Sequence, residues 1–234
     1  MYKPYMNKKL SVIARYQEDI SWAEKLETDV IIYNKGETFD FDYPHIDIPN
    51  IGREGETFIR AIIENYEILD QYEYVAFLQG HPFQHCPKAI EIVNNYNPSE
   101  YILLCELPSK HIVDPYKKIF NMHYLTIEKL FNIEKKYSAN IQSYQSEVLG
   151  DCMFEIKEMV ILCDILGIDT TKGAESFWAT GAQYLIKPEF ILSKNKDWWI
   201  NFHTLMQYVF ENDHVEIGYT VERIWPLIWN HKTN

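Results

Sequence analysis

The chain of 234 residues lacks several sequence features that define large protein classes. Its 9 glycines and 10 prolines are too few for a collagen-like or low-complexity chain. It contains no Gly-x-Gly-x-x-Gly motif and no Walker loop, which disfavours a Rossmann dehydrogenase or a P-loop kinase. It also contains no Gly-x-Ser-x-Gly elbow, which disfavours a serine hydrolase. With 47% hydrophobic residues and no recognisable linker, it is expected to fold as one globular domain.

Paired cysteines and long apolar runs are also missing. The four cysteines, Cys86, Cys105, Cys152 and Cys163, show no Cys-x-x-Cys spacing, so we expect reduced thiols. Reduced thiols are typical of a cytoplasmic protein. The longest apolar run ends at Cys163 after five residues, and the start of the chain lacks the apolar stretch of a secretion signal. We therefore expect a cytoplasmic protein without a transmembrane segment.

Positive charge is scarce. The 22 lysines and arginines are outnumbered by 34 aspartates and glutamates, which gives a formal net charge of −12. This charge repels a phosphate backbone, and no local basic patch offsets it. Nucleic acid is therefore excluded as an expected partner, whereas the oligomeric state is left open.

The hydrophobic pattern predicts an α/β fold. Apolar runs at 10–16, 29–34, 45–49, 74–78, 101–107 and 182–186 predict strands. Helical spacing predicts helices at 21–26, 58–69, 120–131, 156–163 and 198–209, and a tail helix at 221–229 that Pro226 should kink or restart. We therefore predict a mixed, mostly parallel sheet flanked by helices in a single domain, 1–234. Residues 1–107 would form a nucleotide-binding half and residues 108–234 an acceptor half.

Polar residues follow three of the predicted strands. The run Tyr74-Val-Ala-Phe-Leu ends in a polar tip, Gln79-Gly-His81, while Arg15 closes the first strand and Asn34 the second. Ligands of open α/β sheets bind outside the carboxyl ends of the parallel strands. These strand ends therefore predict a common binding site.

Five blocks of the sequence, in order and over nearly the whole chain, resemble an uncharacterised family, a domain of unknown function. They are Ser11-Val-Ile-Ala-Arg-Tyr-Gln-Glu-Asp-Ile-Ser-Trp22, Asn50-Ile-Gly-Arg-Glu54 with Ile62-Ile-Glu-Asn-Tyr66, Phe77-Leu-Gln-Gly-His-Pro-Phe83, Ala182-Gln-Tyr184 and Glu222-Arg-Ile-Trp225. That family is similar to the GT-A glycosyltransferases. The resemblance implies a GT-A-like fold and a nucleotide-sugar donor, with transfer of the sugar to a glycan, lipid-linked or protein acceptor. It implies no tightly bound organic cofactor.

The metal motif expected from this resemblance is altered. GT-A enzymes carry Asp-x-Asp where this chain has the Gln79 to His81 tip, although Mn²⁺ and Mg²⁺ prefer carboxylate oxygens. Either the metal is absent or its ligands come from elsewhere. The candidate ligands are His81 and the pair Asp40 and Asp42, although the Tyr43-Pro44 that follows this pair favours a solvated loop there.

The resemblance assigns donor-binding roles to residues at the strand ends. Arg15, with Glu18 and Asp19, would contact the base and ribose, and Gly52 with Arg53 would hold the diphosphate at a helix start. The alternatives are a surface ion pair with helix capping by Asp19 or Ser21, and a glycine turn with Arg53 paired to Glu56 or Glu54. The remaining predicted donor-binding residues are Asn34, Asn50, Gln79, Gly80, His81, Gln183 and Arg223.

Glycosyl transfer with inversion needs a base that removes the proton of the acceptor hydroxyl. Candidate bases are Glu222, Glu106 and Asp114, and Glu222 is favoured because it lies in a matching block beside Arg223, although a structural ion pair also explains it. A glycosyltransferase is the leading hypothesis. The alternatives are a non-catalytic carbohydrate-binding or scaffold protein of the same fold, and a metal-dependent hydrolase that uses His81, His85, Asp40 and Asp42.

Overall fold

The computed structural model describes residues 8–38, 43–95, 101–104, 162–163, 165–168, 182–211 and 217–230. The chain forms two compact units. The first contains Met1–Glu106, Ala179–Gly218 and Lys232–Asn234, and the second contains Leu107–Trp178 and Tyr219–His231. All strands of the described sheet belong to the first unit. The prediction of a single domain divided near residue 107 stays a prediction.

Six strands in the described part of the chain form one sheet, in the order β3-β2-β1-β4-β6-β5. The pairs β3–β2, β2–β1 and β1–β4 are parallel, while β6 is antiparallel to both β4 and β5. The predicted mixed, mostly parallel sheet of an α/β protein is therefore confirmed. The strands are β1 (Lys9–Arg15), β2 (Asp29–Asn34), β3 (His45–Asp47), β4 (Tyr74–Gln79), β5 (Tyr101–Leu103) and β6 (Tyr184–Ile186).

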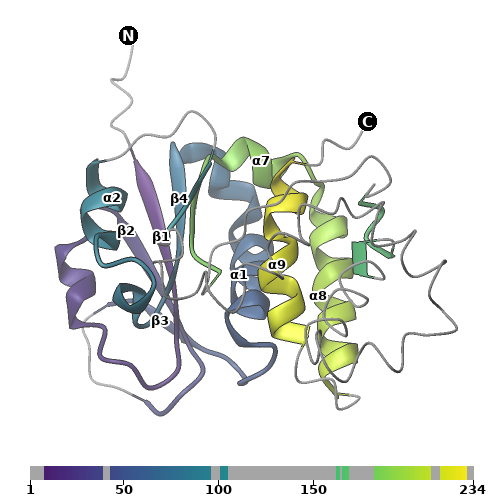
Figure 1. Cartoon of the computed structure of the whole chain (residues 1–234), viewed down its shortest axis with the longest axis horizontal. Helices are drawn as coiled ribbons and strands as arrows, with labels where there is room; N and C mark the ends of the chain where they lie inside the picture. Colours follow the sequence, from purple (N-terminus) through teal and green to yellow (C-terminus); the bar gives the residue numbers. More distant parts are fainter. Residues whose placement is uncertain are drawn as a thin grey trace, which may run out of the picture. The chain divides into compact units, whose positions relative to one another are not determined.

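Helices flank this sheet on both faces, with α2 on one face and α1 on the other (Figure 1). Helix α8 packs against α1. Among the described residues, no helix is long and apolar enough to cross a membrane. The described helices are η1 (Ser21–Lys25), α1 (Arg53–Asn65), η2 (Tyr66–Gln71), η3 (Pro82–Gln84), α2 (Ala89–Asn95), α7 (Pro188–Leu192), α8 (Lys196–Glu211) and α9 (Ile217–Asn230), of which the η elements are 3-10 helices.

The alternation of side chains along the strands creates two apolar layers, because successive residues of a strand point to opposite faces. On one face, Ile13, Ile32 and Leu78 join a buried cluster with Trp22 of η1 and Val93 of α2. On the other face, the ring of Phe77 in β4 lies 5.1 Å from that of Phe58 in α1. Both faces of the central strands are thus covered, which leaves the strand ends as the polar part of the sheet.

Most element predictions that fall on described residues are confirmed, with two differences. The predicted helix at 21–26 is the five-residue 3-10 helix η1. Helix α9 continues through Pro226, so a restart there is wrong, while a kink stays a prediction. The buried side chains of Ile224, Trp225 and Ile228 hold the helix on both sides of the proline. The predicted helix at 120–131 and residues 156–161 of the next one lie outside the described residues.

Candidate functional site at the carboxyl ends of the strands

The carboxyl ends of β1, β2 and β4 lie at the same edge of the sheet. Arg15 pairs with Asn34 in the register of β1 and β2, and Ala14 pairs with Gln79 in the register of β1 and β4. The strand order also reverses here, since β2 and β3 follow on one side of β1 and β4 on the other. Such a reversal is the usual place for a ligand in an open α/β sheet. The predicted common edge is therefore present.

Arg15 and Asn34 are buried and bind to neighbouring residues of the sheet edge. Nη1 of Arg15 donates to Oδ1 of Asn34 at 2.6 Å and to the carbonyl of Glu37 at 3.1 Å. Nδ2 of Asn34 donates to Oδ1 of Asp47 at 2.7 Å. The exposed fractions of the two residues are 9% and 1%. These contacts tie together the ends of β1, β2 and β3, and a direct role of Arg15 or Asn34 in donor binding stays a prediction.

The loop after β1 places Glu18 against the tip of β4. Oε2 of Glu18 accepts the backbone N–H of Tyr16 at 2.7 Å, and a Cβ atom on Gly80 would lie 2.5 Å from this oxygen. Nε1 of Trp22 donates to the carbonyl of Gly80 at 2.9 Å. A side chain at position 80 would therefore displace the carboxylate of Glu18 from its place between the two strand ends.

Asp19 forms local contacts at the start of η1. Its Oδ1 accepts the backbone N–H of Ser21 at 2.9 Å, and its Oδ2 accepts the hydroxyl of Ser21 at 3.1 Å. The backbone hydrogen bond from Ser21 lowers the pKa of the Asp19 carboxyl. These contacts form a local turn before η1, whose N-cap residue is Ile20 and has no side-chain cap hydrogen bond. The donor-binding role of Asp19 stays a prediction.

Gln79, the last residue of β4, is held from two sides. Its side-chain Nε2 donates to Oε1 of Glu54 at 2.9 Å. Its backbone N–H donates to Oε1 of Gln183 at 3.2 Å. The buried amide of Gln183 in turn donates to the carbonyls of Pro82 and Leu104, each at 3.3 Å. Gln183 thus joins the tip of β4 to the turn that follows it.

Each of the two residues that hold Gln79 is preceded by a residue in the left-handed backbone region. Arg53 has φ 53° and Ala182 has φ 51°, and they are the only non-glycine residues with positive φ in the described ranges. This conformation costs roughly 1–2 kcal/mol for a residue with a side chain. Arg53 directly precedes Glu54 and Ala182 directly precedes Gln183, the two residues that hold Gln79. Backbone strain of this kind gathers at functional sites.

The turn before α1 also depends on a glycine. Gly52 has φ 58°, and a Cβ atom there would lie 2.7 Å from Cβ of Glu56. Asn50 lies exposed two residues earlier. The first turn of α1 therefore begins at two consecutive left-handed residues, Gly52 and Arg53.

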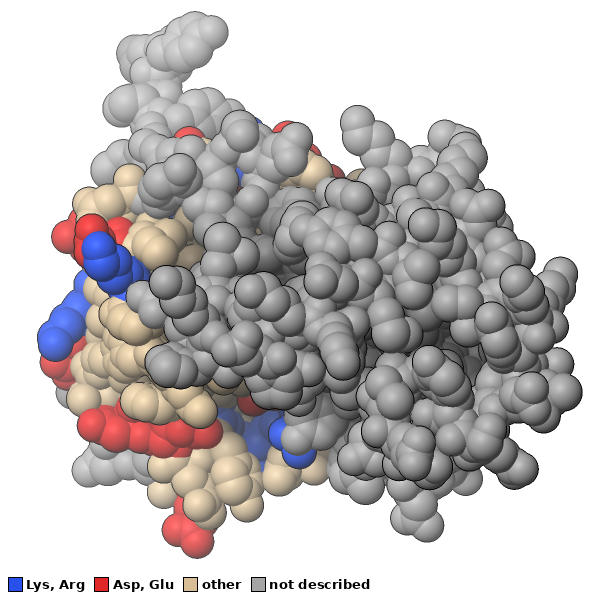
Figure 2. Space-filling view, in the orientation of Figure 1, with Lys and Arg blue, Asp and Glu red and all other residues tan. Residues whose placement is uncertain are grey.

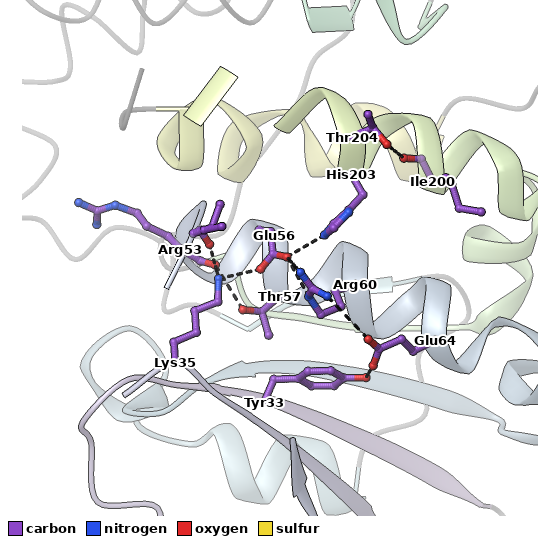
Figure 3. A network of polar contacts seen from close by, with 11 residues as sticks. Tyr33, Lys35, Arg53, Glu56, Thr57, Arg60, Glu64, Ile200, His203 and Thr204 are labelled. Atoms are coloured by element: carbon purple, nitrogen blue, oxygen red, sulfur yellow. Dashed lines mark hydrogen bonds and ion pairs between the residues drawn. The ribbon is translucent and has the colours of Figure 1, made fainter. Parts of the chain in front are cut away.

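A buried polar network fixes this turn to the rest of the first unit (Figure 3). Nζ of Lys35, the residue after β2, donates to the carbonyl oxygens of Ile51 and Arg53, the latter at 2.6 Å. The same Nζ lies 2.9 Å from Oε2 of Glu56, whose side chain is fully buried. Lys35 thus holds the turn in its left-handed conformation from the end of β2.

Glu56 is the centre of the network. Its Oε1 lies 2.7 Å from Nη2 of Arg60 and 2.7 Å from Nε2 of His203 in α8. Burial raises the pKa of Glu56, but the hydrogen bond from His203 and the charges of Lys35 and Arg60 outweigh it, and the pKa falls to about 2. Burial also lowers the pKa of Lys35, against the attraction of Glu56. The sequence analysis missed this network, although the spacing of Glu56 and Arg60 is that of a helical ion pair.

His81 and His85 follow the tip of β4. His81 is exposed, and its ring lies 5.9 Å from that of Phe83. Burial lowers the pKa of His85, while the charge of Glu54 raises it and that of His81 lowers it. Glu54 and the two histidines therefore share one electrostatic environment at the end of β4. Glu54 enters the sequence-based prediction only as a possible partner of Arg53, and its place after the Asn50-Ile-Gly-Arg turn is the one signal for a site role.

A divalent metal site was predicted from His81, Asp40 and Asp42. Within the described ranges, no group of three or more His, Cys, Asp or Glu side chains is arranged to hold a metal ion. Asp40 and Asp42, two of the predicted ligands, lie outside those ranges. Metal binding by His81, Asp40 and Asp42 stays a prediction, and we derive no chemical step through a metal.

Three residues were predicted as catalytic bases: Glu106, Asp114 and Glu222. Glu106 and Asp114 lie outside the described residues. Glu222 is partly buried in α9, in the second unit, and the backbone of its neighbour Arg223 continues the same helix. Their catalytic and donor-binding roles stay predictions.

A concave feature lies at the opposite edge of the sheet. A cavity of about 370 Å³ opens beside Tyr74, the first residue of β4, and is lined by Asp70, Glu73, Lys187 and Glu189 among others. Three carboxyl groups against one lysine would repel a diphosphate. On the face seen in Figure 2, acidic and basic side chains are interspersed over the described surface. An anionic ligand would therefore have to be bound by individual basic groups, such as those at the first turn of α1.

The comparisons with known proteins assign no family to this chain. No family model matches it, and searches of curated proteins and of solved structures gave no match at the significance threshold applied. The motifs and the geometry of the strand ends therefore carry the functional proposal.

Proposed function

We propose that this protein is a glycosyltransferase that moves a sugar from a nucleotide-sugar donor to a hydroxyl group of a glycan, lipid-linked or protein acceptor. The observation that carries the proposal is the polar edge where β1, β2 and β4 end and the strand order reverses. The order of strand, strand, Asn-x-Gly turn, helix and strand with a polar tip is also what the GT-A resemblance implies.

The first turn of α1 is the proposed diphosphate site. A helix of 13 residues carries partial positive charge at its amino end, and its first backbone N–H groups point out of that end. The exposed Arg53 lies in this turn, and Lys35 fixes the turn through its carbonyls. A guanidinium adds two parallel donors for phosphate oxygens. Together these groups would stabilise the negative charge that grows on the leaving diphosphate.

A non-catalytic binding protein with the same fold is the second candidate. It is favoured by the Gln79-Gly80-His81 tip, which lacks the carboxylate pair of the GT-A metal motif. Such a protein would bind carbohydrate without turnover. The hydrolase alternative depends on Asp40 and Asp42, whose positions lie outside the described residues.

Isothermal titration calorimetry with UDP, GDP and free sugars tests the proposal. We expect binding of at least one nucleoside diphosphate. Replacing Arg53→Gln should weaken that binding by about tenfold or more, because a charged hydrogen bond is lost. The matched control Lys88→Gln removes one positive charge from an exposed side chain elsewhere and should leave the affinity unchanged. A protein that binds a free glycan and ignores both nucleotides would be the non-catalytic binder instead.

A further inference from the structure

We propose that Glu54 is the carboxylate that removes the proton of the attacking hydroxyl and that Gln79 is the residue that positions it. This inference rests on the proposed glycosyltransferase function and adds the residue that acts as its base. It differs from the sequence candidates Glu222, Glu106 and Asp114.

The contacts of Glu54 leave one oxygen available. Its Oε1 accepts the amide of Gln79 at 2.9 Å, whereas Oε2 accepts no hydrogen bond from any residue in the described ranges. The side chain is partly exposed, so a ligand at the strand ends can reach it. One oxygen is thus fixed in direction while the other is open to a hydroxyl, which is the geometry that a general base requires.

The residues around Glu54 restrict where this oxygen points. The strained residue Arg53 sets the direction of the chain into Glu54, and Lys35 holds the carbonyl of Arg53 at 2.6 Å. On the other side, Gln79 is fixed through its backbone by Gln183, which follows the strained Ala182. One unfavourable backbone conformation thus directly precedes Glu54 and the other precedes the residue that fixes Gln79, which is a sign of preorganisation.

The charges nearby suit this role. Glu54 favours the charged forms of Lys35 and His85, against the burial that lowers the pKa of both groups. Lys35 is already paired with Glu56 at 2.9 Å. Within the described residues, no cation therefore forms an ion pair with Glu54. Glu54 can therefore receive a proton without breaking an ion pair.

The proposed step transfers the sugar from the nucleotide to the acceptor hydroxyl. The oxygen of the acceptor hydroxyl attacks the anomeric carbon of the donor sugar, and its proton passes to Oε2 of Glu54. The bond between the anomeric carbon and the phosphate oxygen breaks, and its electron pair leaves with the nucleoside diphosphate. When water replaces the acceptor, the same step releases free sugar and nucleoside diphosphate, which gives an assay that needs no known acceptor.

The test compares Glu54→Gln with Glu91→Gln, a matched change of an exposed glutamate on α2. Release of UDP or GDP from UDP-glucose, UDP-N-acetylglucosamine and GDP-mannose gives the rate, and calorimetry with UDP and GDP gives the affinity. We expect Glu54→Gln to lower the rate by roughly 10²–10⁴-fold with the nucleotide affinity unchanged, because general-base catalysis contributes that range. Glu91→Gln should match the wild type in both.

Two further variants separate a base from a structural residue. Exogenous formate should restore part of the rate of Glu54→Ala, because a small carboxylate can occupy the vacated space. Gln79→Ala should lower kcat with little change in KM, since it misdirects the base and leaves the donor site intact. Neither effect is expected of a residue that only supports the fold.

The outcomes that overturn the inference are distinct from failure of the proposed function. Glu54 is not the base if the wild type binds a nucleotide but Glu54→Gln turns the donors over as fast as the wild type. The same holds if the wild type binds a nucleotide but turns over none of the three donors. If Glu54→Gln loses nucleotide affinity in proportion to its rate, Glu54 binds the donor instead. If the wild type binds no nucleotide at all, the proposed function itself fails, and the inference fails with it.

Discussion

Glu54 and Glu56 lie two residues apart at the start of α1 and have opposite surroundings. The Glu56 side chain is fully buried and contacts Lys35, Arg60 and His203 within 3 Å, at 2.9, 2.7 and 2.7 Å. Glu54 is partly exposed and accepts one side-chain hydrogen bond, from Gln79. Two glutamates in one helical turn therefore differ in burial and in the number of their partners, and these differences decide what each can do.

The comparison separates a structural carboxylate from a reactive one. A buried charge with several partners is held in place, and removing it leaves its partners buried and uncompensated. A carboxylate with one fixed and one open oxygen can exchange protons with a ligand. We infer that Glu56 builds the turn from which Glu54 acts.

The largest expected effect is on stability. Glu56→Gln should lower the free energy of unfolding by about 3 kcal/mol, because it leaves the charges of Lys35 and Arg60 without their buried partner. The matched change Glu54→Gln should lower it by less than about 1 kcal/mol, the scale of one net hydrogen bond. Urea denaturation of both variants measures the two values. Equal losses would remove the distinction between the two glutamates.

The same contrast predicts a pH dependence of stability. The pKa of Glu56 falls from 4.5 to about 2 in the folded protein, so the unfolded chain binds more protons between these values. The stabilisation by Glu56 is therefore complete above about pH 4.5 and is lost as the pH falls toward 2, by about 3 kcal/mol. The difference in unfolding free energy between wild type and Glu56→Gln should shrink across this range. A difference independent of pH would contradict the ionised, paired state of Glu56.

A smaller effect is expected from relieving the strain at Arg53. Glycine adopts φ 53° without steric cost, so Arg53→Gly should raise the free energy of unfolding by about 1 kcal/mol. The same variant should bind UDP or GDP more weakly, because the guanidinium is lost. Thermal unfolding and calorimetry on one sample measure both changes. A variant that is less stable than the wild type would show that the side chain of Arg53 contributes more than its backbone costs.

The sheet was largely predictable, for a local reason. The strands β1, β2 and β4 are short runs rich in apolar residues, buried along nearly their whole length, and such runs are visible in the sequence. The polar residues at their ends, Arg15, Asn34 and Gln79, follow from the same pattern. Helix α8 was visible for the same kind of reason, since Trp198, Phe202 and Met206 repeat at helical spacing.

The site was less predictable because its contacts join distant residues. Glu56 and His203 are separated by 147 positions, and Gln79 and Gln183 by 104. No local pattern specifies such pairs. The left-handed conformation of Arg53 is also imposed from outside, by the bonds of Lys35 to the turn, whereas Gly52 alone is an expected signal. The turn was therefore predictable, whereas Glu54 and Glu56 were predicted only as possible partners of Arg53.

The measurement that tests the central claim most directly is a crystal structure of the protein soaked with UDP or GDP. We predict that the diphosphate lies at the first turn of α1, within hydrogen-bond distance of the Arg53 side chain, with Oε2 of Glu54 facing the space beside it. A nucleotide bound at the opposite edge of the sheet, in the cavity beside Tyr74, would contradict the account.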